Sequence, residues 1–356
     1  MNFSRTLIIK PSSMGDVVQA LPVLTALKEA HPTAHVSWLV ARPFAGILEG
    51  HPRLDDVLLF DRRRFGRFTL SVTVAAEFLA FLKDLRTKRF TTVIDLQGLF
   101  RSGLLAMASG APTRVGFREA REGAPLFYTD EVSTGRRDMH AVDRYLAAAR
   151  RMGLGMPQAT DHLPVSAEAR GAARRLLAEQ GLGPAEPFVV VCAHARWLTK
   201  QWPPERFAQV LDRMRGQAGA RAVLIGSAEA VANGRAVAQA MTEPPIDLTN
   251  RTTLKELVAV IAEARAMVTN DSGPMHVAAA VGTPVVAIFG PTNPNRTGPY
   301  GPGHRVLGGR AACSPCYRRQ CLYGSGTAAG LLCLTNITPE AVTEQLLEAW
   351  RQAEPR

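Results

Sequence analysis

Short apolar runs alternate with longer helical patterns along the whole chain. The runs that are typical of strands lie at residues 6–9, 35–40, 57–60, 92–95, 188–192, 222–226, 266–269 and 285–289. The helical patterns between them lie at residues 16–29, 43–49, 71–86, 204–217, 229–241, 253–264 and 273–281. Apolar strands separated by helices are typical of parallel sheets that are covered on both faces. The pattern therefore predicts an α/β fold.

The alternation occurs in two series, separated by a segment rich in glycine and proline between residues 155 and 187. We therefore expect two doubly wound domains, at residues 1–165 and 166–338. A last helix is expected within residues 339–356, with Thr338 as N-cap and Pro339 at its first position. Ligands of doubly wound sheets bind beyond the carboxyl ends of the strands, so the natural site is a cleft between two such domains.

Composition indicates a globular protein with a sizeable core. Hydrophobic residues make up 46% of the 356 residues and charged residues 21%, which excludes a disordered chain. No apolar run reaches the roughly 18 residues that a membrane span needs. The first residues show no small-residue cleavage site after an apolar stretch, so no signal peptide is predicted. We expect a soluble, cytoplasmic protein.

The chain is strongly basic, with a formal net charge of +11. Only six of its 42 basic residues are lysine; arginine binds carboxylates and phosphates bidentately, although codon bias alone also produces arginine. Residues 62–121 contain 12 basic and four acidic residues. This concentration favours an anionic surface or ligand as a partner of that region.

The loop after the first strand, residues 10–16, contains no dinucleotide fingerprint and no P-loop. Gly15 permits a tight turn and a close approach of the backbone to a ligand. Asp16 lies where the first helix begins, and two interpretations remain open from the residues alone. The carboxylate caps the helix, or it is a general base held on a rigid element.

Two loops of the second series suit a phosphate. Gly273 and Pro274 open a helix whose free N–H groups would bind an anion, and His276 lies in its first turn. Lys200 follows the strand at residues 188–192 by one loop. The alternatives are a buried helix histidine for His276 and a solvated lysine for Lys200.

Several segments together resemble the lipopolysaccharide heptosyltransferases of glycosyltransferase family 9. They are SSMGDV (residues 12–17), TKQWP (199–203) and DSGPMHVAAAVGTPVVAIFGPTNP (271–294). IDLQGLFRS (94–102), REGAPLFY (121–128) and HAVDRY (140–145) are most similar to the heptosyltransferase I branch. The resemblance implies a GT-B fold of two facing Rossmann-like domains. It also implies transfer of L-glycero-D-manno-heptose from ADP-heptose to the Kdo–lipid A inner core, with inversion and without a metal on the diphosphate.

The resemblance also implies residue roles. It makes Asp16 the general base that accepts the proton of the acceptor hydroxyl. Donor-binding positions are Lys200, Glu229, Thr252, Leu254, Asp271, Ser272, Gly273 and His276. Acceptor-binding positions, which would meet Kdo carboxylates and lipid A phosphates, are Ser13, Gly15, Arg62, Arg63, Arg64, Arg121 and His140. The chain departs from the branch pattern at Ala195 and Arg196, where hydroxyl residues often face the diphosphate.

No cofactor is expected, because ADP-heptose is a substrate and the leaving group needs no metal if Lys200 and the helix start hold it. Four cysteines form the pattern C-x2-C-x4-C-x11-C, at Cys313, Cys316, Cys321 and Cys333. The first pair has the spacing of zinc ligands. Ordinary or redox-labile thiols are the favoured interpretation, and a structural zinc stays open as the alternative.

The expected partners are ADP-heptose, an anionic glycolipid of the Kdo–lipid A type and the inner face of the cytoplasmic membrane. Three alternatives remain: a heptosyltransferase II-like enzyme, another GT-B sugar-nucleotide enzyme such as an epimerase, and a basic protein that binds polyanions without catalysis. Nucleic acid is not expected as a partner, because aromatic residues make up only 6% of the chain and no nucleic-acid motif is present.

Overall fold

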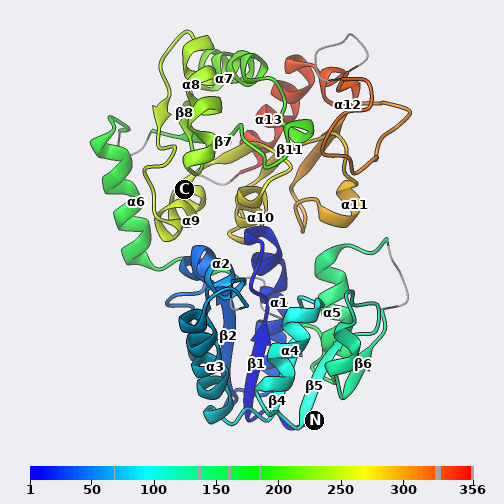
Figure 1. The fold of residues 1–356 in the computed structure, drawn as a ribbon. Coiled ribbons are helices and arrows are strands. Elements are labelled where there is room, and N and C mark those ends of the chain that lie inside the picture. Colours follow the sequence, from blue (N-terminus) through cyan, green and yellow to red (C-terminus); the bar gives the residue numbers. More distant parts are fainter. Residues whose placement is uncertain (68, 135–137, 159–161, 184–185, 325–329, 354–356) are drawn as a thin grey trace. The chain divides into compact units, whose positions relative to one another are not determined.

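The computed structural model describes the chain except for residues 68, 135–137, 159–161, 184–185, 325–329 and 354–356. The chain forms two compact units, Met1–His162 and Leu163–Arg356, and each is drawn as its own α/β body in Figure 1. Among the described residues, no helix is both long and apolar enough to cross a membrane.

The first unit is built on a six-stranded parallel sheet with the order β3-β2-β1-β4-β5-β6. Its strands are β1 (Arg5–Ile9), β2 (His35–Ala41), β3 (Asp56–Phe60), β4 (Thr92–Asp95), β5 (Thr113–Phe117) and β6 (Asp130–Val132). Its helices are α1 (Met14–Ala30), η1 (Arg42–Ile47), α2 (Arg62–Phe65), α3 (Val72–Thr87), α4 (Phe100–Ala108), η2 (Ala124–Phe127) and α5 (Ala141–Arg151). This strand order is that of a Rossmann-like doubly wound sheet.

The second unit repeats this topology with the order β12-β11-β10-β7-β8-β9. Its strands are β7 (Phe188–Cys192), β8 (Arg221–Leu224), β9 (Ile246–Asp247), β10 (Ala266–Asn270), β11 (Val285–Phe289) and β12 (Arg305–Gly308). Its helices are α6 (Ala167–Glu179), η3 (Leu198–Lys200), α7 (Pro204–Ala218), η4 (Ala228–Ala230), α8 (Val231–Ala240), α9 (Leu254–Glu263), α10 (Gly273–Ala280), α11 (Pro294–Thr297), α12 (Leu332–Thr335) and α13 (Pro339–Gln352). The predicted fold of two doubly wound sheets and a C-terminal helix is confirmed.

The last helix, α13, completes the core of the second unit. Its buried side chains Val342, Leu346 and Trp350 belong to one cluster with residues of β7, β10, β11 and α7. The turn before it is held by the indole of Trp202, whose Nε1 donates to the Ile337 carbonyl at 3.2 Å. These apolar side chains are buried within the second unit. The further expectation that this helix packs back on the first domain stays a prediction.

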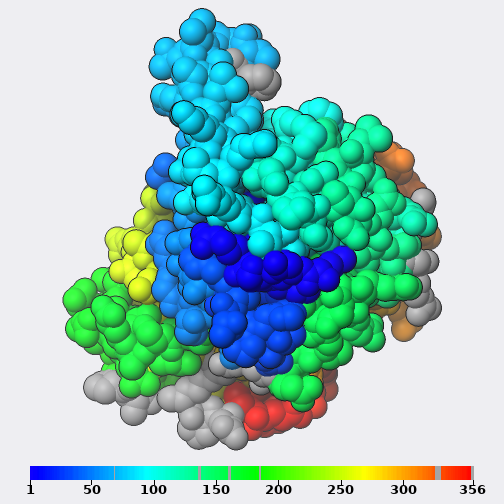
Figure 2. Space-filling view, turned by 90° about the horizontal axis from the view of Figure 1, so that it is seen from below, coloured from blue at the N-terminus to red at the C-terminus, as the bar shows by residue number. Residues whose placement is uncertain are grey.

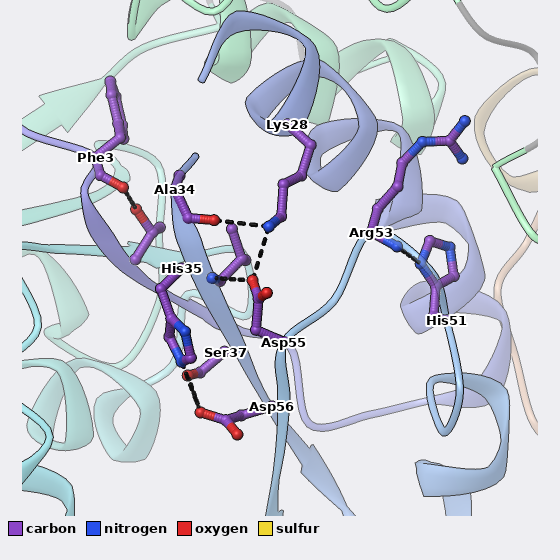
Figure 3. Close-up of polar contacts among 11 residues, drawn as sticks. Phe3, Lys28, Ala34, His35, Ser37, His51, Arg53, Asp55 and Asp56 are labelled. Carbon is purple, nitrogen blue, oxygen red and sulfur yellow. Dashed lines mark hydrogen bonds and ion pairs between the residues drawn. The ribbon is translucent and has the colours of Figure 1, made fainter. Parts of the chain in front are cut away.

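Paired charges fix the edge of the first sheet where β2 meets β3 (Figure 3). The Asp55 carboxylate accepts hydrogen bonds from Lys28 Nζ and the Val36 amide, each at 2.7 Å. The side chains of His35 and Asp56 are joined at 2.8 Å. Burial alone would raise the pKa of Asp55, but the hydrogen bonds from Lys28 and Val36 outweigh it and hold that pKa below its usual value.

This pKa shift predicts an acid-sensitive contribution to stability. Because the pKa of Asp55 is lower in the folded than in the unfolded state, its carboxylate stabilises the fold above pH 3.8, and this stabilisation is lost as the pH falls through the folded value. At pH 7 we expect Asp55→Asn to lower the free energy of unfolding by about 1 kcal/mol, a modest value because the carboxylate is partly exposed. Urea unfolding from neutral to acid pH should show this difference shrinking. Asp84→Asn, at an exposed 3.9 Å pair with Lys88, is the control, and a pH-independent difference at Asp55 would contradict the assignment.

Candidate active site

Asp16 lies in the first turn of α1, directly beyond the carboxyl end of β1. Its Oδ2 accepts hydrogen bonds from the amide and the hydroxyl of Ser13, at 2.9 and 2.6 Å. The bond from the Ser13 amide is one half of the capping box at the start of the helix, and the bond from the Ser13 hydroxyl adds to it. The side chain of Asp16 is still 42% exposed, so the carboxylate caps the helix and also faces solvent. The structure therefore shows the capping contact, and the role of Asp16 as general base stays a prediction.

Sequence analysis assigned no role to Lys10, which the structure places beside Asp16. Its ammonium lies 3.9 Å from Asp16 Oδ1 and donates to the Leu96 carbonyl at 3.2 Å. Burial alone would lower the pKa of Lys10, but Tyr145, Asp16 and Asp95 outweigh it and raise that pKa above its usual value. Lys10 is therefore a buried cation whose ammonium lies beside the Asp16 carboxylate.

A buried acid, Asp95, ends β4 in the same unit. It accepts hydrogen bonds from the Tyr128 hydroxyl at 2.7 Å and from the Gln97 amide at 2.8 Å. Burial raises the pKa of the Asp95 carboxyl despite these donors. Asp95 and Tyr128 both lie within segments that carry the family resemblance. Their contact joins positions 33 residues apart, so no local sequence pattern predicts it.

The contact between Tyr128 and Asp95 depends on the absence of a side chain at Gly116. A Cβ atom at Gly116 would lie 2.2 Å from the Tyr128 ring, so the ring would have to move. We expect Gly116→Ala to lower the free energy of unfolding by about 1–3 kcal/mol. Gly216→Ala is the matched control, because that position in α7 has open space and alanine should stabilise the helix by up to about 1 kcal/mol. Equal urea midpoints for Gly116→Ala and the wild type would contradict this packing.

The predicted acceptor residues all lie in the first unit and differ in how they are held. Arg62 and Arg63 in α2 are exposed, whereas the guanidinium of Arg64 forms an ion pair with Glu77. Arg121 is exposed, and its amide donates to the Gly98 carbonyl at 3.0 Å. His140 caps α5, where its Nδ1 accepts from the Val142 amide at 3.2 Å.

The two remaining predicted acceptor residues, Ser13 and Gly15, lie at the start of α1. Ser13 contacts Asp16 directly, and Gly15 is buried at the helix start. Acceptor binding at all of these positions stays a prediction.

In the second unit, one carboxylate joins three loops at the carboxyl ends of neighbouring strands. Asp271, directly after β10, accepts from Lys200 Nζ and from the Thr292 hydroxyl through the same Oδ2, each at 2.6 Å. Lys200 comes from the loop after β7 and Thr292 from the loop after β11. The Lys200 ammonium also lies 4.7 Å from the centre of the Trp197 ring. Thr292 was missed by sequence analysis, because its contact with Asp271 is a tertiary one.

The N-terminus of α10 lies immediately after Asp271. Ser272 is its N-cap, and Gly273 and Pro274 are its first residues. His276 follows in the first turn and is only 9% exposed. The first N–H groups of such a helix and its dipole favour an anion. The structure thus places four predicted donor residues, Asp271, Ser272, Gly273 and His276, on one loop and helix start, with Lys200 against it.

The residues predicted to meet the nucleoside lie beyond β8 and β9 in the same unit. Asn250 donates through its amide to the Gly226 carbonyl at 2.8 Å, which joins these two loops. Glu229 is exposed in η4. The hydroxyl oxygen of Thr252 is buried without a hydrogen-bond partner among the described residues. The roles of Glu229, Thr252 and Leu254 stay predictions.

Comparisons with known proteins agree on one family. The model of glycosyltransferase family 9 (heptosyltransferase) matches residues 78–326. Lipopolysaccharide heptosyltransferase 1 of Pseudomonas aeruginosa is 31% identical over 96% of this chain and 97% of its own length. The structure of a family 9 glycosyl transferase from Veillonella parvula has a TM-score of 0.83 at 26% identity and 99% coverage of both chains. The E. coli heptosyltransferase WaaC with ADP has a TM-score of 0.77 at 27% identity, covering 97% of this chain and 99% of its own.

Proposed function

The chain belongs to glycosyltransferase family 9, the heptosyltransferases, and on that premise we propose that it transfers L-glycero-D-manno-heptose from ADP-heptose to the Kdo–lipid A inner core of lipopolysaccharide. The observation that carries the proposal is the junction of Lys200, Asp271 and Thr292 beside the start of α10. It occurs in a chain similar over nearly its whole length to a lipopolysaccharide heptosyltransferase 1.

The donor diphosphate is held by the second unit in this proposal. Cleavage of the bond to ADP leaves negative charge on the diphosphate, and Lys200 and the N–H groups at the start of α10 stabilise that charge. Asp271 holds the Lys200 ammonium in place before the donor binds. His276 donates to a phosphate oxygen from the first turn of α10. The transfer step then uses side chains and helix N–H groups of this chain, and we propose no catalytic metal.

The acceptor is activated by the first unit. The carboxylate of Asp16 accepts the proton of the attacking hydroxyl as its oxygen bonds to the anomeric carbon and the bond to ADP breaks. A single displacement of this kind inverts the anomeric configuration and needs no enzyme nucleophile. The Lys10 ammonium lies 3.9 Å from the Asp16 carboxylate that acts as the base. The exposed guanidinium groups of Arg62, Arg63 and Arg121 suit the carboxylates and phosphates of the acceptor.

Release of ADP tests the choice of donor and acceptor. The purified enzyme is mixed with ADP-heptose, ADP-glucose or a UDP-sugar, each with Kdo2–lipid A or with the same acceptor already carrying one heptose. We expect rapid ADP release only with ADP-heptose and Kdo2–lipid A. Release only with the heptosylated acceptor would indicate the heptosyltransferase II-like alternative, and release of ADP from ADP-glucose or of UDP from the UDP-sugar would reject the proposed donor.

We further propose that the enzyme works at the inner face of the cytoplasmic membrane, where its acceptor lies. The light-blue segment that contains α2 and α3 stands out from the body of the first unit in Figure 2. It carries the exposed arginines Arg62 and Arg63, and two exposed apolar side chains, Leu70 at 82% and Val72 at 89%. Cations beside exposed apolar groups suit an anionic lipid surface.

Removing two of these charges should weaken membrane binding. We expect Arg62→Ser/Arg63→Ser to bind vesicles containing phosphatidylglycerol about 30-fold less tightly, at about 1 kcal/mol for each charge. Co-sedimentation at low and high salt measures the effect. The control is Arg235→Ser/Arg351→Ser, which removes the same charge from exposed positions of the second unit. Equal loss in both double variants would contradict docking through α2.

A further inference from the structure

We propose that Cys313, Cys316, Cys321 and Cys333 form a structural metal centre, in which four thiolates hold one thiophilic divalent ion, with zinc as the first candidate. The sequence alone favours ordinary thiols for these residues. Their placement in the fold favours the metal. The centre is distinct from the residues proposed for sugar transfer, and it does not depend on the identity of the substrate.

The first observation is that all four cysteines surround one cavity. The cavity has a volume of about 170 Å³, and all four line it together with mainly apolar neighbours such as Leu331 and Leu332. Four of the five cysteines of the chain therefore line one cavity, although the first and the last are 20 positions apart. All four are free thiols.

Cysteines gathered around one cavity have a clear chemical use, because soft thiolate ligands select zinc and iron among the divalent ions of the cell. Each thiol gives its proton to solvent as its sulfur bonds to the ion.

The second observation concerns the segment that contains Cys313, Cys316 and Cys321 and leads to Cys333 in α12. Between β12 and α12, the described residues 309–324 and 330–331 contain no helix and no strand. Long segments without secondary structure are uncommon in compact domains and need another source of order. A metal held by residues from both ends of the segment would supply it, because metal binding then contributes directly to the stability of the folded loop.

The segment also lies against the loops that carry the proposed donor site. The Tyr317 amide donates to the Pro291 carbonyl at 2.8 Å, and the Thr199 hydroxyl donates to the Arg318 carbonyl at 2.8 Å. Pro291 and Thr199 directly precede Thr292 and Lys200, the two partners of Asp271. A metal centre in this segment would therefore fix the backbone on which the donor-binding side chains stand.

The thiols must move to complete the centre. No group of three or more histidine, cysteine or acidic side chains in the described part of the chain is arranged to hold an ion as it stands. Cys313, Cys316 and Cys321 lie on the segment without secondary structure, whereas Cys333 lies in α12. The proposal therefore expects the three loop cysteines to close toward Cys333 when the ion binds.

Elemental analysis of the full-length protein tests the proposal without any assay of transfer. Protein purified without chelator, or reconstituted anaerobically with zinc or ferrous iron, should contain about one ion per chain. Replacing zinc by cobalt should give intense sulfur-to-cobalt absorption. Cys313→Ser/Cys316→Ser should lose the ion, whereas Cys192→Ala, the matched control at the fifth cysteine, should keep it. The metal analysis identifies the ion as zinc or iron.

Limited proteolysis adds a measurement that does not depend on the folding of the variants. Arg318 and Arg319 are exposed trypsin sites within the segment, and metal should protect them in the wild-type protein. Chelation should restore cleavage there. Wild-type protein without bound metal after reconstitution, or with metal that remains in the double variant, would overturn the proposal.

Discussion

We expect Asp16→Asn to lower kcat by about 10²–10⁴-fold while ADP binds as tightly as it does to the wild type. The amide cannot accept the proton of the acceptor hydroxyl, and the residues proposed to hold ADP all lie in the second unit. The fold should survive the change, because the amide oxygen of asparagine still accepts the hydrogen bonds that Ser13 now donates to Asp16. Steady-state transfer and ADP titration calorimetry measure the two quantities.

The chain offers a matched control for the capping role of Asp16. Glu256 forms the same capping box at the start of α9, where its carboxylate accepts from the amide and hydroxyl of Thr253 at 2.7 and 2.8 Å. Glu256→Gln should change stability about as much as Asp16→Asn and leave kcat within a few-fold of the wild type. If both variants lose kcat equally, Asp16 acts through the helix cap and not as the base.

Lys200→Met should lower kcat with ADP-heptose by about 10²–10³-fold. The Lys200 ammonium is held by Asp271 just before the start of α10, and its loss removes stabilisation of the leaving diphosphate. Affinity for ADP should fall as well, because the same phosphates remain in the product. Lys255→Met, an exposed lysine on α9, is the control for the change of charge and should leave both quantities unaltered.

A loss of folding must be separated from a loss of catalysis at Lys200. Its ion pair with Asp271 is largely buried, with side chains 17% and 6% exposed, and removing one member of such a pair costs about 3–5 kcal/mol. The double variant Lys200→Met/Asp271→Asn removes both charges and should recover much of the stability without recovering turnover. Turnover that returns together with stability would show that Lys200 has only a structural role.

The sequence predicted most of the central strands of both sheets, but it missed β5, the edge strands β6, β9 and β12, and also the helices α4, α5 and α6. β7 and β11 are continuous buried apolar runs, so their composition alone identifies them. β6 and β9 have three and two residues and include acidic side chains. They are strands only because a neighbouring strand supplies hydrogen bonds, and such tertiary pairing leaves no local pattern.

The candidate site likewise contains one contact that the sequence spacing predicts and others that it does not. The contact of Ser13 with Asp16 follows from their spacing, since a residue three positions into a helix faces its N-cap. The pair of Lys200 and Asp271 joins positions 71 residues apart, and the family resemblance, not the spacing, brought these two residues into the prediction. Lys10 and Thr292 were not predicted as site residues, because a buried lysine and a loop threonine have no distinctive sequence signal.

Mass spectrometry of the acceptor tests the central claim most directly. Kdo2–lipid A is incubated with ADP-heptose and either wild-type enzyme or Asp16→Asn, and the molecular mass of the glycolipid is then measured. The account predicts that the wild type adds one heptosyl residue and that the variant leaves the acceptor unmodified although it still binds ADP. An acceptor left unmodified by the wild type, or modified equally by both proteins, would contradict it.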